Sequence, residues 1–274
     1  MFKIIIMALL IFIGMVGYDN ITDKAQPTTP IQQEQQKVSK HEKSAAMALF
    51  TSLLPPKEEW PSPVHKFYLA FNMDEVIDPI RQNPNWTSLD AMSRDIPQAL
   101  IAIEDHAFYN HGAIAVEGIL RAALANINAG EVVQGGSTLT QQFVKNVFLS
   151  HEQSMERKIE EAVLSLMLED NYSKDEILEL YLNTTYFGAG STGIKQASRT
   201  YFGKAPSALT LAEAAVIASL PYAPTSLNPL ENPEGCKKRQ LLVLAAMHKY
   251  GMINQGQLAE AKTEKICLTN GTVM

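Results

Sequence analysis

The hydrophobic and polar residues of this chain follow a helical period over most of its length. Between Ser150 and Glu169 the apolar positions fall three or four residues apart, as they do on one face of an α-helix. Pro97 can open another helix, which runs through Ile103. Strand-like alternation is nearly absent from the sequence. The pattern therefore predicts a mainly α-helical domain.

Short polar motifs mark where several of these helices begin and end. A capping box, in which Ser or Thr is followed by Glu three residues later, occurs at Ser173–Glu176, Thr210–Glu213 and Ser39–Glu42. Gly203 and Gly251 lie at positions where helix C-caps are expected. These signals divide the second half of the chain into several separate helices.

The first eighteen residues form an apolar segment in which Lys3 is the only charge. The unbroken core Ile4–Val16 has the length of a signal-peptide core, and the flanking residues bring it nearer to a membrane span of roughly 20 residues. Because no A-x-A-like cleavage site follows, we expect an uncleaved N-terminal anchor, with a cleaved signal peptide as the alternative. In both cases the rest of the chain is exported.

A polar stretch rich in Gln, Thr and Pro follows the anchor and reads as a linker. A helix from 39 to 54 is then expected, whereas residues 55–93 carry no clear signal. The sequence therefore divides into an anchor at 1–18, a linker at 19–40, a main domain at 41–234 and a helical C-terminal connector at 235–274.

The amino-acid composition narrows the classes of protein to which the chain can belong. Apolar residues make up 46% of the 274 positions and charged residues 19%, which is typical of a folded protein. The net charge of −6 argues against a dedicated nucleic-acid binder, because phosphates need a cationic surface. Cys236 and Cys267 are too far apart for a Cys-x-x-Cys metal or redox motif.

The first segment that packing does not explain surrounds Glu104 and Asp105, directly after the apolar helix. A carboxylate at an apolar helix end can have a raised pKa and act as a general acid or base, although solvent-facing acids at a helix terminus are the alternative. Asp105 is expected to orient its neighbours. His111 is expected to form a structural hydrogen bond, with a ligand or base as the other reading, and Phe108 lies between them.

The second segment combines glycines, hydroxyls, amides and a cation at the start of a helix. Free backbone N–H groups and a positive helix end can hold an anionic or sugar oxygen. An ordinary capped helix is the alternative, and the spacing is not that of a Walker P-loop. The candidate residues are Gly136, Ser137, Thr138, Gln141, Gln142, Lys145 and Asn146.

The third segment places Arg157 and Lys158 four and three residues before Glu161, so that one carboxylate can meet two cations. Such a patch can bind a phosphate group, while a solvated salt-bridged face is the alternative. The fourth segment, Lys174–Lys204, contains Asn183 and several glycines that permit close backbone approach.

The order and spacing of these segments resemble the family 51 glycosyltransferases, the peptidoglycan polymerases found in class A penicillin-binding proteins and monofunctional transglycosylases. All five family motifs occur in order, with one departure, in that the glycine of the first motif directly follows the histidine. The motifs are Glu104–Gly112, Gly135–Asn146, Arg157–Glu161, Ile177–Asn183 with Tyr201–Lys204, and Leu211–Pro221 with Asn228–Pro229.

This resemblance implies a lysozyme-like, two-lobed fold behind the membrane anchor, with a hydrophobic flap within Ala113–Val133. It implies that lipid II and a growing glycan-lipid are the substrates, and that a β-1,4 glycan strand and undecaprenyl diphosphate are the products. The implied location is the bacterial cytoplasmic membrane, with the catalytic domain on its periplasmic or extracellular side and with cell-wall synthesis or division proteins as possible partners.

The resemblance also implies roles for individual residues. Glu104 is the general base, and Lys145, Arg157 and Lys158 neutralise the leaving diphosphate. Glu161 orients these cations or helps to hold a divalent metal ion, Mg or Mn. A lysozyme-like lytic enzyme and a non-catalytic lipid II-binding scaffold are the alternatives. We expect no transpeptidase activity, because the Ser-x-x-Lys and Lys-Thr-Gly motifs are missing from the sequence.

Overall fold

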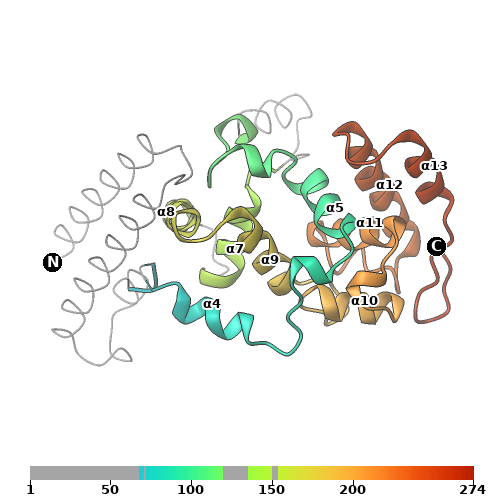
Figure 1. The fold of residues 1–274 in the computed structure, drawn as a ribbon, viewed down its shortest axis with the longest axis horizontal. Coiled ribbons are helices and arrows are strands. Elements are labelled where there is room, and N and C mark those ends of the chain that lie inside the picture. Colours follow the sequence, from blue (N-terminus) through green and yellow to red (C-terminus); the bar gives the residue numbers. More distant parts are fainter. Residues whose placement is uncertain (1–67, 71, 120–134, 150–153) are drawn as a thin grey trace. The chain divides into compact units, whose positions relative to one another are not determined.

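The computed structural model describes residues 68–70, 72–119, 135–149 and 154–274 (Figure 1). Residues Met73–Met274 form one compact unit, and the preceding residues belong to another, of which one helical turn is described. The predicted anchor and linker, the helix at 39–54 and most of the flap lie outside the described residues. Within the described ranges, no helix is long and apolar enough to cross a membrane.

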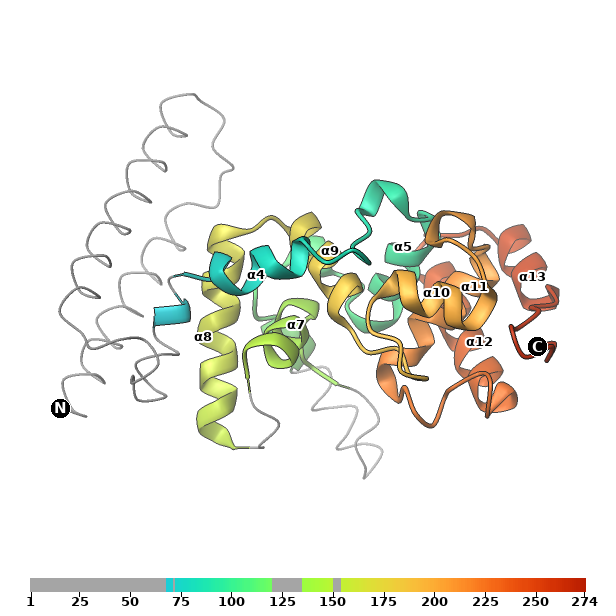
Figure 2. The same cartoon turned by 90° about the horizontal axis from the view of Figure 1, so that it is seen from below.

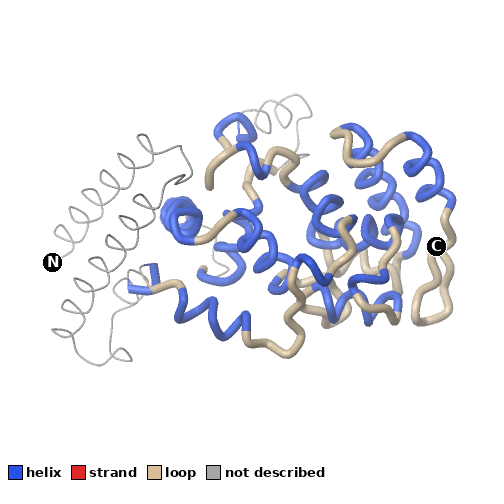
Figure 3. Tube along the Cα trace, viewed as in Figure 1, coloured by secondary structure: helices blue, strands red, loops and turns tan. Residues whose placement is uncertain are grey.

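The regular elements of the described residues are helices, so the predicted mainly α fold is confirmed (Figure 3). Pairing of β type is limited, in this part of the chain, to two isolated bridges. The helices are α4 (Asp74–Arg81), α5 (Asp95–Glu104), α7 (Leu139–Phe148), α8 (Met155–Asn171), α9 (Lys174–Thr184), α10 (Ile194–Phe202), α11 (Leu211–Ser219), α12 (Pro233–Lys249) and α13 (Gln255–Thr263).

The helices of the compact unit pack in two groups (Figures 1 and 2). In one group α5, α11 and α12 contact one another, and α10 and α13 pack against them. In the other group α7 packs on α8 and α9, and α4 packs on α9. Helix α10 also contacts α9, which joins the groups. The C-terminal end of α5 reaches the second group, and this junction carries the site described below.

Helix α11 forms the centre of the first group. Its residues from Ala212 to Ser219 are all buried. A helix that is apolar on every side must be enclosed by neighbours, and its alanines let those neighbours approach closely. Glu213 is buried at its first turn, where it completes a capping box with Thr210 and accepts from Lys204 Nζ at 2.6 Å.

The predicted helix boundaries agree with local hydrogen bonding. The capping boxes at Ser173 and Thr210 are both formed, which confirms them. Gly203 ends α10 in the left-handed conformation with φ of 66°, and Gly251 follows α12 with φ of 73°. The helix predicted from position 150 is described from Met155, with Ser154 as its N-cap.

A loop with several positive-φ residues joins α9 to α10. At Gly193 φ is 84° and ψ is 152°, a conformation that only glycine adopts readily. A Cβ atom there would lie 2.6 Å from the backbone oxygen of Asn183. Gly190 also has a positive φ of 70°, but a Cβ on it would meet no atom within 4 Å. Gly193 is therefore required both by its dihedral angles and by close backbone approach.

Replacing Gly193 with Ala is expected to destabilise the protein by about 2–4 kcal/mol, because strain and a backbone clash add. Gly190→Ala is the matched control and should cost about 1 kcal/mol, since it introduces dihedral strain alone. Chemical denaturation followed by circular dichroism measures both. Equal losses in the two variants would contradict the close-approach argument.

Candidate active site

The site is built around the carboxylate of Glu104, the last residue of α5. Gln142 Nε2, from α7, donates to Glu104 Oε2 at 3.0 Å. Burial raises the pKa of the Glu104 carboxyl, and the charge of Asp105 adds to this effect. The Gln142 hydrogen bond and the positive charges of Arg239 and Lys145 act in the opposite direction. The net result is a raised pKa, as a general base working near neutral pH requires.

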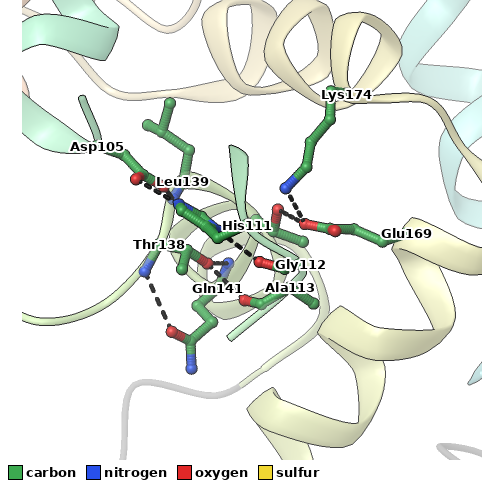
Figure 4. Close-up of polar contacts among 10 residues, drawn as sticks. Asp105, His111, Gly112, Ala113, Thr138, Leu139, Gln141, Glu169 and Lys174 are labelled. Carbon is green, nitrogen blue, oxygen red and sulfur yellow. Dashed lines mark hydrogen bonds and ion pairs between the residues drawn. The ribbon is translucent and has the colours of Figure 1, made fainter. Parts of the chain in front are cut away.

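The neighbouring carboxylate, Asp105, joins the first motif to the second (Figure 4). Its Oδ2 accepts the backbone N–H of Leu139 at 3.0 Å, one of the otherwise unpaired donors at the start of α7. Its Oδ1 lies 2.7 Å from His111 Nε2. Both oxygens are therefore used in holding other groups, which is the orienting role that the sequence suggested for Asp105.

His111 is held between two acceptors. Its Nδ1 lies 2.6 Å from the carbonyl oxygen of Gly112, and its Nε2 faces Asp105. A neutral imidazole donates from only one nitrogen, so this arrangement favours the doubly protonated ring. The hydrogen bond to Asp105 is the main cause of a raised pKa for His111. Because the folded pKa is raised, the contribution of His111 to stability is full below its ordinary value near 6.5 and is lost as the pH rises through the folded value.

The start of α7 is fixed by its own polar residues (Figure 4). Thr138 is the N-cap, and its side chain forms a capping box with Gln141. Thr138 Oγ1 also donates to the Ala113 carbonyl oxygen at 2.7 Å. Both side chains are buried and engaged in these hydrogen bonds, so they fix the position of the first turn of α7. Gly136 and Ser137 precede the helix and are partly exposed.

The second and third motifs meet through Lys158. Its Nζ donates to Ser137 Oγ at 3.1 Å and pairs with Glu161 Oε1. Glu161 is 2% exposed, so this ion pair is largely desolvated on the carboxylate side. The spacing predicted that Arg157 would meet Glu161 as well, and this part of the prediction is wrong. Arg157 Nε is instead buried without a hydrogen-bond partner.

The remaining predicted residues differ in how they are placed. Lys145 and Asn146 are exposed on α7. Phe108 is fully buried, with Lys174 Nζ 4.4 Å from its ring centroid. Asn183 exchanges hydrogen bonds with the backbone of Thr87, donating to its oxygen at 2.8 Å and accepting from its nitrogen at 2.9 Å. Asn183 therefore holds the segment at Thr87 in place, whereas the ring of Phe108 packs edge-on against His111, with the ring centroids 6.5 Å apart.

Arg239 is the residue that sequence reasoning missed. It lies on α12, in the segment predicted to be a connector, yet its charge acts on Glu104. Its guanidinium carbon lies 4.1 Å from the centroid of the Tyr222 ring, and its Nε is buried without a partner. The sequence does show the basic cluster Lys237–Arg239, but only the packing of α12 determines which of its side chains faces Glu104.

The described residues do not form a ligand set for a resident metal ion. They contain no group of three or more His, Cys, Asp or Glu side chains that could hold one. Glu161 is the one candidate carboxylate, and Lys158 occupies one of its oxygens. A divalent ion at this position would need most of its oxygen ligands from a bound diphosphate and from water.

Comparison with known proteins places the chain in a family. The sequence model described as "Transglycosylase" matches residues 73–248, which is more than half of the chain. The chain belongs to the transglycosylase family. The matched range begins at the first residue of the compact unit and extends almost to the end of α12, so it includes Arg239.

Several relatives share this region. A "Putative transglycosylase" of Cupriavidus necator is 40% identical over 71% of this chain and 84% of its own length. Proteins named "Penicillin-binding protein 1A" from Neisseria flavescens and Aquifex aeolicus are each 44% identical over 68% and 64% of this chain. The chain spans about a quarter of those two relatives, 23% and 24%. A crystal structure of penicillin-binding protein 1A from Haemophilus influenzae aligns over 48% of this chain and 16% of its own, with 33% identity and a TM-score of 0.34.

Replacing Arg239 with Gln is expected to raise the pKa of Glu104 further, because a positive charge that stabilises the carboxylate is removed. Carboxyl NMR titration of labelled protein measures this shift directly. Lys145→Gln is the comparison variant and should shift the pKa less, since Arg239 is the stronger of the two charges acting on Glu104. An unchanged titration in Arg239→Gln would contradict this assignment.

Proposed function

We propose that the chain is a peptidoglycan glycosyltransferase that polymerises lipid II into β-1,4 glycan strands and releases undecaprenyl diphosphate. The observation that carries the proposal is the half-buried carboxylate of Glu104, whose pKa is raised and which lies among cations supplied by separate helices. Family membership and the relatives named above support the same reaction. The proposal concerns glycan polymerisation alone, since these 274 residues contain neither Ser-x-x-Lys nor Lys-Thr-Gly.

In this proposal Glu104 is the general base. The 4-hydroxyl of the acceptor sugar is a weak nucleophile, and its attack on C1 of the donor requires removal of its proton. Glu104 accepts that proton as the new C1–O4 bond forms and the bond between C1 and the diphosphate oxygen breaks. Gln142 holds one carboxylate oxygen, so the other can face the acceptor hydroxyl.

The leaving diphosphate takes the bonding electrons and develops negative charge, which Lys145, Arg157 and Lys158 are proposed to neutralise. The contact from Lys158 to Ser137 supports this, because it brings the third motif against the glycine-rich start of the second. The unpaired Nε of Arg157 is a donor without an internal acceptor. Cations already in place when charge develops stabilise the transition state without later reorganisation.

Glu161 is proposed to fix Lys158 and to be the single protein ligand of a divalent ion, Mg or Mn, that shares the diphosphate. Its low exposure and its contact with Lys158 support the first of these roles. A metal ion held by one carboxylate and substrate phosphates is a common arrangement for Mg. When bound, the ion would supply additional charge neutralisation at the diphosphate.

The remaining parts of the proposal concern location. The N-terminal apolar segment is proposed to anchor the enzyme in the cytoplasmic membrane, with the domain on the outer side and with cell-wall synthesis proteins as partners. Anchoring enzyme and lipid-linked substrate to one surface raises their effective concentration. A lytic enzyme of lysozyme-like fold needs no cations for a diphosphate, so the contact between Lys158 and Ser137 favours the polymerase.

Glu104→Gln is expected to lower lipid II polymerisation by at least about 100-fold, because the amide cannot accept the acceptor proton. Glycan chains formed in detergent or liposomes are measured by gel electrophoresis. Glu260→Gln, an exposed position on α13, is the matched control and should retain activity. Near-normal polymerisation by Glu104→Gln would overturn the assignment of the base. Soluble muropeptides released from finished peptidoglycan would favour the lytic alternative.

Removing divalent ions with EDTA is expected to lower polymerisation, and added Mg or Mn should restore it, because the ion neutralises the leaving diphosphate. Inhibition by moenomycin, which mimics the family's donor, provides the positive control for specific activity. Full activity in excess EDTA would remove the metal from the proposal and leave the roles of Glu104 and Lys158 intact.

A further inference from the structure

A buried tyrosine that the proposed reaction does not use is connected to the proposed base, Glu104, through the side chain of Gln142. Tyr181, on α9, is 1% exposed, and its hydroxyl lies 3.0 Å from Gln142 Oε1. The same amide donates from Nε2 to Glu104 Oε2 at 3.0 Å. Three side chains from α9, α7 and α5 thus form one hydrogen-bonded chain that ends at the carboxylate.

The direction of each bond in this chain follows from chemistry. An ionised carboxylate only accepts, so the amide nitrogen of Gln142 must face Glu104. The amide oxygen then faces Tyr181, whose hydroxyl must donate. Burial raises the pKa of Tyr181, and the charge of Glu104 adds to that effect, so the phenol keeps the proton that it donates.

We propose that Tyr181 is a positioning residue, whose hydroxyl locks the amide of Gln142 in the one orientation that donates to Glu104. This inference rests on the proposed role of Glu104 as general base. The lock has two effects on the base. It keeps one carboxylate oxygen hydrogen-bonded to Gln142, so that the other oxygen can face the hydroxyl of the acceptor sugar. It also stabilises the ionised form of Glu104, which can accept a proton.

Other charged groups also act on the carboxylate, and they differ from the phenol in kind. Arg239 on α12 and Lys145 on α7 stabilise the charge of Glu104, and the adjacent Asp105 opposes it. These charges act through space whatever the amide does. Tyr181 acts only through the orientation of the amide, so removing its hydroxyl should change the base while leaving those three charges in place.

Without the hydroxyl, the carboxylate of Glu104 alone selects which end of the Gln142 amide faces it, and the amide oxygen loses the donor that holds it from the other side. Rotation of the amide by half a turn would place its oxygen against the carboxylate, where two acceptors repel each other. The carboxylate would then lose its donor for part of the time, and its protonation would become easier. The expected signature is a shift of the acidic limb of activity to higher pH.

The test compares wild-type protein with Tyr181→Phe, which removes one oxygen atom from a buried ring. We expect the acidic limb of kcat to move up by about one pH unit. We expect the rate at high pH to fall roughly 3- to 10-fold, because the Glu104 carboxylate is less well oriented toward the acceptor hydroxyl. KM for lipid II should be nearly unchanged, since no group that binds the substrate is removed. Glu104 titrated by carboxyl NMR should show the same upward shift.

Tyr201→Phe is the matched control. Tyr201 is also fully buried, and its hydroxyl donates to the Phe187 carbonyl oxygen at 2.8 Å instead of to the amide. Loss of a buried tyrosine hydroxyl is common to both variants, so melting temperatures separate general destabilisation from the positioning effect. The pH profile of Tyr201→Phe should match that of the wild type.

Gln142→Leu provides an independent variant, should Tyr181→Phe fold poorly. It should reproduce the shift in the Glu104 titration, and the double variant should add nothing further, because both residues act through one hydrogen bond. Coincident pH profiles and NMR titrations for wild type and Tyr181→Phe would overturn the positioning role. Absence of polymerisation by the wild type would overturn the proposed function, while the NMR titration would still decide the role of Tyr181.

Discussion

The placement of one carboxylate, Glu104, at the junction of the two helix groups is the constraint on which the rest of the site depends. Removing a carboxylate from water is costly, and its position at the C-terminal end of α5 adds the unfavourable helix dipole. The surroundings offset this cost only in part, through the Gln142 hydrogen bond and two cations from other helices. The carboxylate therefore stays ionisable, with its pKa above the ordinary value. A fully compensated carboxylate would be a poor base.

Two adjacent carboxylates show how strongly environment divides their roles. Asp105 is engaged at both oxygens, by the N–H of Leu139 and by His111. Glu104 accepts one amide hydrogen bond and is surrounded by charge at a greater distance. The bond from Asp105 to α7 also fixes where α7 starts relative to the end of α5. Since Gln142 lies one turn further along α7, the bond from Asp105 also sets the position of the side chain that donates to Glu104.

What could be predicted from the sequence was local. Capping boxes at Ser173 and Thr210 involve groups three residues apart, so their chemistry is visible in the residue order. Helix α4 was missed because Pro79 lies inside it and the flanking sequence carries no cap. It is held by long-range contacts, including Arg81 with Glu176 at 2.9 Å. No pattern within a short window encodes such a contact.

The same limit applies to the site. Spacing alone suggested that Arg157 and Lys158 would share Glu161, but only Lys158 does so. Asn183 stands in a family motif, yet its amide holds the backbone of Thr87. A family motif can therefore contain residues, such as Asn183, that hold the fold together, and residue order alone does not identify them.

Helix α12 shows why the boundary of the functional unit is set by packing. The segment after position 234 was expected to be a connector, but α12 packs against α5 and α11 and carries Arg239 toward Glu104. A helix that packs one face in the core has its backbone fixed, so the points from which its other side chains extend are fixed as well. Arg239 can act on the charge of Glu104 because residues such as Val243 and Met247, which are fully buried, fix the position of the same helix. The surroundings of the Glu104 carboxylate and the core of the first helix group therefore depend on the same helices.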